Sequence, residues 1–298
     1  MEAPQLRPLG VGDIVDRVFA LYRAKPMLLI AASAVPYLVF VLVIAAVTVV
    51  LATSIGGIAE VVGAFAGGAV PSGPLLQNTI FALFGLLFFI VVAAVVILSV
   101  QTTALVHATA SRYLGKELTL GEAFRLGLGS APRVILAGLS IFLMFILLWL
   151  VLVVLMVLSR QALVVAGIVL LGFIATVYLF ASTLVTPVVA TLEHLGPIAA
   201  IRRAWSLSTG NRWRILGLQM LLGVINAVLS AIVSAIFVTS IISDPALRTA
   251  FQQITNAVVT ILWAPVEWGT FAVLYYDLRV RREAFDLQLA AEALPRGS

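Results

Sequence analysis

The chain has 298 residues, of which 62% are hydrophobic and only 10% are charged, and its mean hydropathy is +1.17. Soluble domains carry about a quarter of their residues as charges, so the composition excludes an ordinary soluble protein and indicates an integral membrane protein. The net charge of +5 does not indicate a nucleic-acid partner, because the basic residues lie at the ends of apolar segments. The absence of cysteine excludes disulfides and thiolate metal sites.

The charge-free stretches of the chain are long enough to cross a bilayer, which takes roughly 20 apolar residues in a helix. They predict an all-α membrane protein with six transmembrane helices. The expected helices cover about 26–54, 78–113, 133–158, 161–191, 213–242 and 250–280. The connection at 159–161 is so short that the third and fourth helices must pack antiparallel.

Short amphipathic segments precede three of the expected spans, at about 11–25, 119–129 and 196–210. We expect each to lie in the cytoplasmic interface ahead of a transmembrane hairpin, which gives a single membrane domain of three such units. These segments either fix the tilt of the helices or form a platform for a protein partner or anionic lipid. Their marker residues are Asp13, Arg17, Glu122, Arg125, Arg202, Arg203 and Trp205.

The basic residues predict the orientation of the chain. All of the 18 Lys and Arg residues except Arg160 and Arg248 lie in or next to the N-terminal segment, the second and fourth connections, or the tail at about 281–298, which Arg279 precedes. By the positive-inside rule, both termini are expected in the cytoplasm. The outside loop at about 54–77 is rich in Gly and Pro yet apolar, so it either covers the bundle, dips into the outer leaflet or lines a pore.

Polar residues inside the expected spans fall at helical spacings, which places them on common faces. The fifth and sixth helices would join theirs into a polar seam made of Gln219, Asn226, Asn256, Thr260, Glu267 and Thr270. A second cluster on the second helix consists of Gln101, Thr103 and His107. Glu267 stands out, because an ionisable group inside a span is costly and by default a functional candidate. It could also be hydrogen-bonded glue between helices, or be exposed to water.

No motif of an enzyme is present: the chain lacks a phosphate-binding loop, a His-Glu-x-x-His sequence and a plausible Ser, His and Asp set. The two histidines leave little material for a zinc site. We therefore expect no catalytic residues, no metal and no cofactor.

Four segments of the chain resemble a known bacterial family. They are 6–17, 113–123, 195–205 with Trp213 and Arg214, and 274–287. These segments are similar to the membrane domain of glycerophosphoryl diester phosphodiesterases. The resemblance implies a multi-pass protein of the bacterial plasma membrane. The hydrolase activity of that family belongs to a separate soluble barrel, which has no counterpart in this chain.

The sequence favours a non-enzymatic membrane anchor or scaffold for protein partners or lipids. The alternative is a small transporter or lipid-handling permease that uses the polar seam around Glu267; an intramembrane enzyme comes third. The expected partners are membrane lipids, a protein at the cytoplasmic face and a second copy of the chain.

Overall fold

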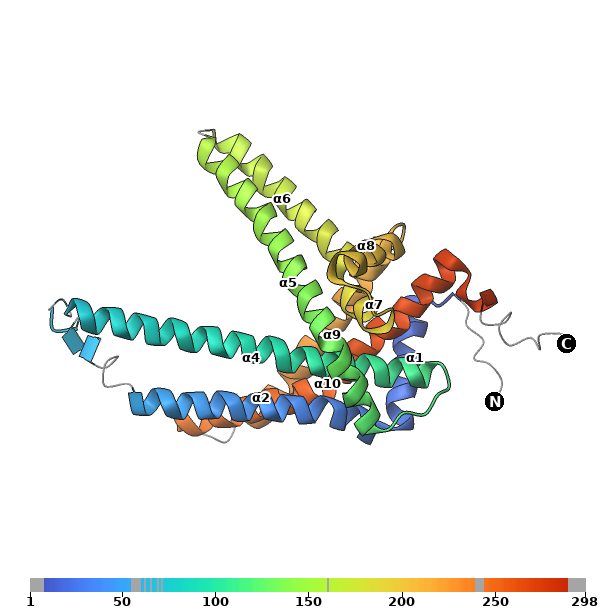
Figure 1. The fold of residues 1–298 in the computed structure, drawn as a ribbon, viewed down its shortest axis with the longest axis horizontal. Helices are drawn as coiled ribbons and strands as arrows, with labels where there is room; N and C mark the ends of the chain where they lie inside the picture. The colour runs from blue at the N-terminus through green and yellow to red at the C-terminus, as the bar shows by residue number, and fades with distance from the viewer. Residues whose placement is uncertain are drawn as a thin grey trace.

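The computed structural model describes residues 8–54, 60, 61, 63, 64, 66–68, 70, 72–159, 161–238 and 244–288. The described part of the chain is all helical (Figure 1). Its elements are α1 (Val11–Ala24), α2 (Pro26–Ser54), α4 (Gly73–Tyr113), α5 (Leu120–Leu158), α6 (Ala162–Thr183), α7 (Thr186–Leu192), α8 (Pro197–Ser208), α9 (Arg212–Val238) and α10 (Pro245–Glu283).

Six segments are long and apolar enough to cross a membrane, which confirms the all-α prediction with six candidate spans and indicates a multi-pass membrane protein. They are Pro26–Val49, Gly73–Tyr113, Leu120–Leu158, Ala162–Leu192, Arg212–Ala235 and Leu247–Glu283. The first expected span, 26–54, agrees with α2 at both ends. The fifth and sixth agree in place, with residues 239–243 between them outside the described residues.

The third span differs from the prediction, because α5 begins at Leu120 and runs on to Leu158. The segment 119–129 is therefore not a separate interfacial helix. The capping box of Thr119 and Glu122 starts the helix as expected, but Pro132 does not end it. A proline inside a helix removes one backbone hydrogen bond. Burial of Gly127 and Ala131 on the same helix supplies packing that offsets this loss.

The fourth span differs in the opposite way: α6 ends at Thr183 and α7 begins at Thr186. Pro187 lies in the first turn of α7. Its ring would clash with the carbonyl group four residues earlier, at Thr183, if one helix continued through this point. The predicted helix over 161–191 is therefore broken at Leu184 and Val185.

The loop expected at 54–77 is shorter than predicted, since α4 begins at Gly73 with Pro74 in its first turn. Much of the remaining loop lies outside the described residues, as do residues 289–298 of the expected cytoplasmic tail. The interpretations of the loop stay predictions.

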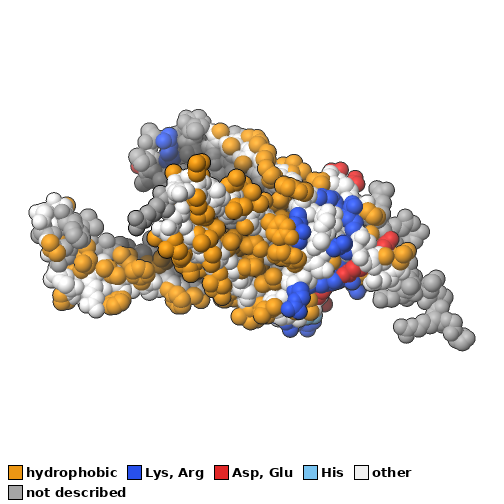
Figure 2. Space-filling model, turned by 90° about the horizontal axis from the view of Figure 1, so that it is seen from above, with side chains coloured by type: hydrophobic (Ala, Val, Ile, Leu, Met, Phe, Trp, Pro, Cys, Tyr) orange, Lys and Arg blue, Asp and Glu red, His pale blue; other side chains and the backbone are white. Residues whose placement is uncertain are grey.

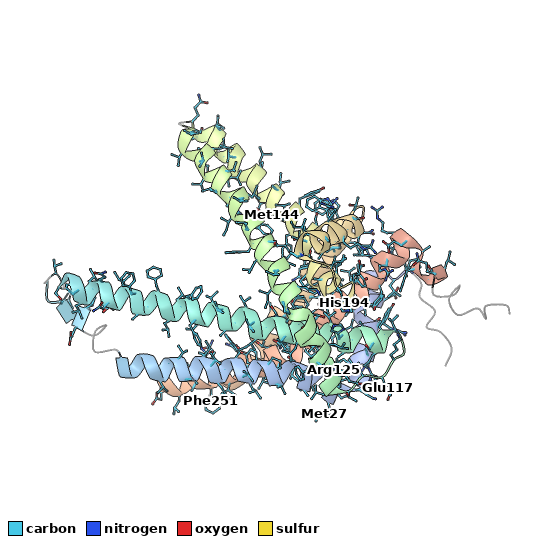
Figure 3. All side chains as sticks on the ribbon, viewed as in Figure 1. Met27, Glu117, Arg125, Met144, His194 and Phe251 are labelled. Atoms are coloured by element: carbon cyan, nitrogen blue, oxygen red, sulfur yellow. The ribbon has the colours of Figure 1, made fainter. Side chains whose placement is uncertain are left out.

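The bundle is held together at one end. The hairpins α2–α4 and α5–α6 diverge from a common end at which α1, α7 and α8 also lie (Figure 1). The hydrophobic core is at this end and includes Ile14, Leu207, Ile215 and Tyr275, each at most 1% exposed. Away from it, large apolar side chains are exposed, such as Leu143 at 54% on α5 and Phe251 at 45% on α10. Met144 and Phe251 mark these two places in Figure 3. Such apolar surfaces suit contact with lipid tails.

The amphipathic helices α1 and α8 turn their apolar faces into this core. Ile14 and Val18 of α1 are 0% and 2% exposed, and Ala204 and Leu207 of α8 are 0% exposed. Much of each face is therefore covered by the protein itself, although Ile198 near the start of α8 is 69% exposed. Figure 2 shows a band of Lys and Arg side chains where the apolar surface ends.

An ion-pair network ties the N-terminal segment to α10 at the same end. The carboxylate of Asp277 is 0% exposed and accepts hydrogen bonds from Leu9 N at 2.7 Å, from Arg281 Nε at 3.0 Å and from Arg214 Nη1. The carbonyl oxygen of Leu9 accepts in turn from Arg281 Nη2 at 2.7 Å. A buried carboxylate is tolerated here because it is fully paired.

A second network ties α8 to α10. Arg203 donates from Nε to both carboxylate oxygens of Glu193, at 3.0 and 2.9 Å, and from Nη2 to Glu283 at 2.9 Å. Tyr275 Oη donates to Glu193 at 2.8 Å. The hydrogen bond to Glu283 raises the pKa of the Arg203 guanidinium above its ordinary value, so this residue stays charged.

Candidate binding cavity between α9 and α10

A cavity of about 220 Å³ lies where α9 packs against α10. Its lining comes from these two helices alone, and is made of Asn226, Ser230, Asn256, Val259, Thr260, Trp263, Ala264 and Glu267. The spacing of these residues explains the arrangement. Steps of three and four residues place Asn256, Thr260 and Glu267 on one face of α10, and a step of four does the same for Asn226 and Ser230 on α9.

The cavity has an apolar floor and a polar rim. Val259 and Trp263 are each 7% exposed and Ala264 is 9% exposed, whereas Asn256 and Thr260 are exposed. Both rim residues belong to the candidate span Leu247–Glu283. The mouth of the cavity therefore opens sideways on a membrane-spanning helix.

The cavity is closed toward the charged end of the bundle. Past Glu267, Thr270 is 0% exposed and Phe271 is 3% exposed. At Gly269, an added Cβ atom would lie 3.1 Å from Val18 Cγ1, so α1 packs directly against α10 at this level. Glu267 lies ten residues before Asp277, or about 15 Å along the helix axis, a distance equal to about half of a hydrocarbon core of about 30 Å.

Glu267 has neither a hydrogen bond nor an ion pair within the described part of the chain, and the same holds for Asn226 and Asn256. The interpretation of Glu267 as hydrogen-bonded glue to α9 therefore has no contact to support it. A half-buried carboxylate beside amide and hydroxyl groups offers acceptors that can bind a ligand. Pockets with a few convergent polar groups on an apolar floor are typical ligand sites.

Two residues of the predicted seam lie elsewhere. Thr270 Oγ1 donates to Val266 O in its own helix, at 2.7 Å. Gln219 does not line the cavity, and its Oε1 atom is buried with no hydrogen-bond partner among the described residues. Helical spacing alone placed Gln219 and Thr270 on the polar faces of α9 and α10. At the level of Thr270, α1 and α4 enclose α10, so this residue is separated from the cavity. The floor residues Val259 and Ala264 gave no signal in the sequence, since small apolar residues occur throughout the spans.

The second polar cluster on α4 holds helices together. Gln101 Nε2 donates to Ser33 Oγ on α2 at 2.8 Å. Thr103 Oγ1 donates to Gly127 O on α5 at 2.9 Å, and His107 Nε2 lies 3.1 Å from Ser130 Oγ on the same helix. All three side chains are buried. The cluster is thus divided between two partner helices, α2 and α5.

Most of the residues that mark the amphipathic segments have structural contacts. Asp13 accepts from Gly10 N at 2.8 Å and Glu122 caps α5, while Arg17 lies over the Tyr113 ring at 5.7 Å. The Trp205 ring is 5.4 Å from that of Tyr178, and Arg203 belongs to the network described above. Arg125 and Arg202 are exposed.

The described residues contain no group of three or more His, Cys, Asp or Glu side chains that could hold a metal ion. The chain matches no protein-family model, no curated protein and no solved structure. The family resemblance of its four segments therefore stays an expectation.

Proposed function

We propose that this protein is a non-enzymatic, lipid-handling permease that binds the polar head of an amphiphile in the cavity between α9 and α10. The observation that carries the proposal is the unpaired carboxylate of Glu267 in a polar-rimmed cavity at membrane depth. An ionisable group in this position is expensive unless water or a ligand pairs with it.

The sideways mouth favours an amphiphile over a solute that arrives from water. Exposed apolar side chains flank the rim on the same helix, with Ile254 at 61%, Val258 at 49% and Leu262 at 43% exposed. A lipid could leave its tails on this apolar surface while its head enters the cavity. The volume of about 220 Å³ corresponds to about seven waters at about 30 Å³ each, which is enough for a small head group.

The anchor or scaffold function stays a prediction and is the second candidate. The band of basic side chains in Figure 2 supports contact with anionic lipid heads. However, α1 and α8 bury most of their apolar faces within the chain. A protein partner would therefore meet charged side chains such as Arg125 and Arg202. It would also meet a few exposed apolar ones, such as Ile198 at 69%.

Transbilayer movement of a fluorescent phosphatidylethanolamine in proteoliposomes tests the proposal. We expect the protein to accelerate this movement over protein-free liposomes. Ser230→Trp fills the cavity, so it should slow the movement about tenfold, equivalent to about 1.4 kcal/mol in the barrier. The matched control is Val228→Trp on the same helix, where the native side chain is 52% exposed and outside the cavity lining.

Val228→Trp should behave like the unmodified protein. If the unmodified protein moves the lipid no faster than protein-free liposomes, the permease function is wrong. Equal slowing by both tryptophans would place the pathway outside this cavity.

A further inference from the structure

We infer that the α9–α10 cavity selects an amphiphile whose head is an organic ammonium ion. This inference rests on the proposed function and names the chemistry of its ligand. It follows from the charge, the polar groups and the aromatic ring that share the lining.

Glu267 is the one ionisable residue of the lining. The other polar groups, on Asn226, Ser230, Asn256 and Thr260, all carry oxygen acceptors. Among the described residues, no basic side chain lines the cavity to hold a phosphate or carboxylate. The same amides and hydroxyls also carry donors, so they suit many polar groups, whereas the Glu267 carboxylate is complemented by a positively charged donor.

Trp263 distinguishes an organic ammonium ion from a metal ion. It lies one helical turn from Glu267 on the same face, and its ring forms part of the buried floor. Indole has the strongest cation–π attraction of the aromatic side chains, and a carboxylate with an aromatic wall suits an ammonium head. A hard metal ion gains nothing from such a ring and prefers a compact shell of oxygen atoms. The volume of about 220 Å³ also exceeds what a single bare ion fills.

Calorimetric titration of the full chain with hexylammonium and with 1-hexanol tests the inference. The two probes share the chain length and differ in the charge of the head. We expect saturable binding of hexylammonium that is at least about tenfold tighter than that of hexanol, or about 1.4 kcal/mol. Glu267→Gln preserves the shape and should remove this preference. Glu117→Gln is the control, because that carboxylate is 84% exposed and pairs with Lys25 far from the cavity lining.

A variant that regains the preference for hexylammonium would show that its loss in Glu267→Gln is not caused by misfolding. Asn256→Asp added to Glu267→Gln returns a carboxylate to the rim and should restore part of the preference for hexylammonium. Equal binding of both probes by the unmodified protein, or an unchanged preference in Glu267→Gln, overturns the inference. Full competition by sodium ions also overturns it, in favour of an inorganic cation.

The outcomes separate the inference from the proposed function. If neither probe binds while Ser230→Trp still slows lipid movement, the ammonium head is wrong and the permease function stands. If the unmodified protein binds hexylammonium but moves no lipid, the site is real and the permease function is wrong.

Discussion

Gly127 sets how closely α4 and α5 approach each other. An added Cβ atom at this position would lie 3.0 Å from Ala104 N and 3.2 Å from Ala104 Cα. Both are backbone atoms of a helix and cannot shift alone. Gly127→Ala should therefore force the helices apart and destabilise the protein by about 1–3 kcal/mol, read as thermal unfolding in detergent.

Gly129→Ala is the matched control, because nothing lies within 4 Å of a Cβ atom added there. Alanine is the better helix former by up to about 1 kcal/mol, so this variant should be neutral or slightly stabilising. Equal unfolding temperatures for the two variants would contradict the close packing of α4 on α5.

At the residue scale, the sequence predicted the polar lining of the cavity but not its limits. The helical period alone places Asn256, Thr260 and Glu267 on one face. Helical spacing does not show which neighbouring helix each residue contacts. Thr270 continues the stripe, yet it is fully buried because α1 and α4 close around α10 there. The absence of a partner for Glu267 likewise depends on the packing of α9.

Arg203 fixes the position of α8 against α10. Its guanidinium reaches two carboxylates at once, those of Glu193 and Glu283. A lysine ammonium is a single point donor and cannot match this geometry. Arg203→Lys should therefore destabilise the protein by about 1.5–3 kcal/mol, the range for hydrogen bonds to charged groups.

The raised pKa of Arg203 determines how its contribution depends on pH. A raised folded pKa gives stability that is fully present below the unfolded pKa, which for arginine lies far above neutral pH. Between about pH 6 and about pH 8, Arg203 therefore stays charged, and its titration should not change the stability difference between Arg203→Lys and the unmodified protein. Arg202→Lys, on the exposed face of the same helix, should leave thermal unfolding unchanged. Equal effects of the two substitutions would contradict the bridging role.

At the element scale, the apolar runs predicted the existence of every span, and the errors lie at prolines. The third span was expected to begin at about residue 133 and the fourth to run unbroken over 161–191. Instead, α5 continues through Pro132, and the fourth span breaks just before Pro187. A proline weakens a helix by a fixed local amount, but packing decides whether the helix continues. Gly127 and Ala131 pack closely before Pro132, and this burial is not visible in a single sequence.

At the scale of the whole molecule, packing and charge are concentrated at one end. The N-terminal segment is bonded through Leu9 to Asp277 on the last helix, so both ends of the described chain lie together. From the distribution of its Lys and Arg residues, the sequence predicted both termini on the same side of the membrane. It did not predict that α1 and α8 would be covered by the chain itself, because an amphipathic pattern does not say whether lipid or protein meets the apolar face.

The orientation of the molecule is open to a direct test because the chain has no cysteine, so any introduced thiol is unique. Glu117 is exposed at the charged end in Figure 3, and Arg248 is exposed at the start of α10, one turn before Phe251. The excess of Lys and Arg around Glu117 predicts that this end faces the cytoplasm. In intact cells, a membrane-impermeant maleimide should label Arg248→Cys, and should label Glu117→Cys only after the membrane is permeabilised. The opposite labelling pattern would mean that the charged end of the molecule faces the outside. Thr270 and Phe271 close the cavity toward that end, so the cavity would then be closed from the outside instead of from the cytoplasm.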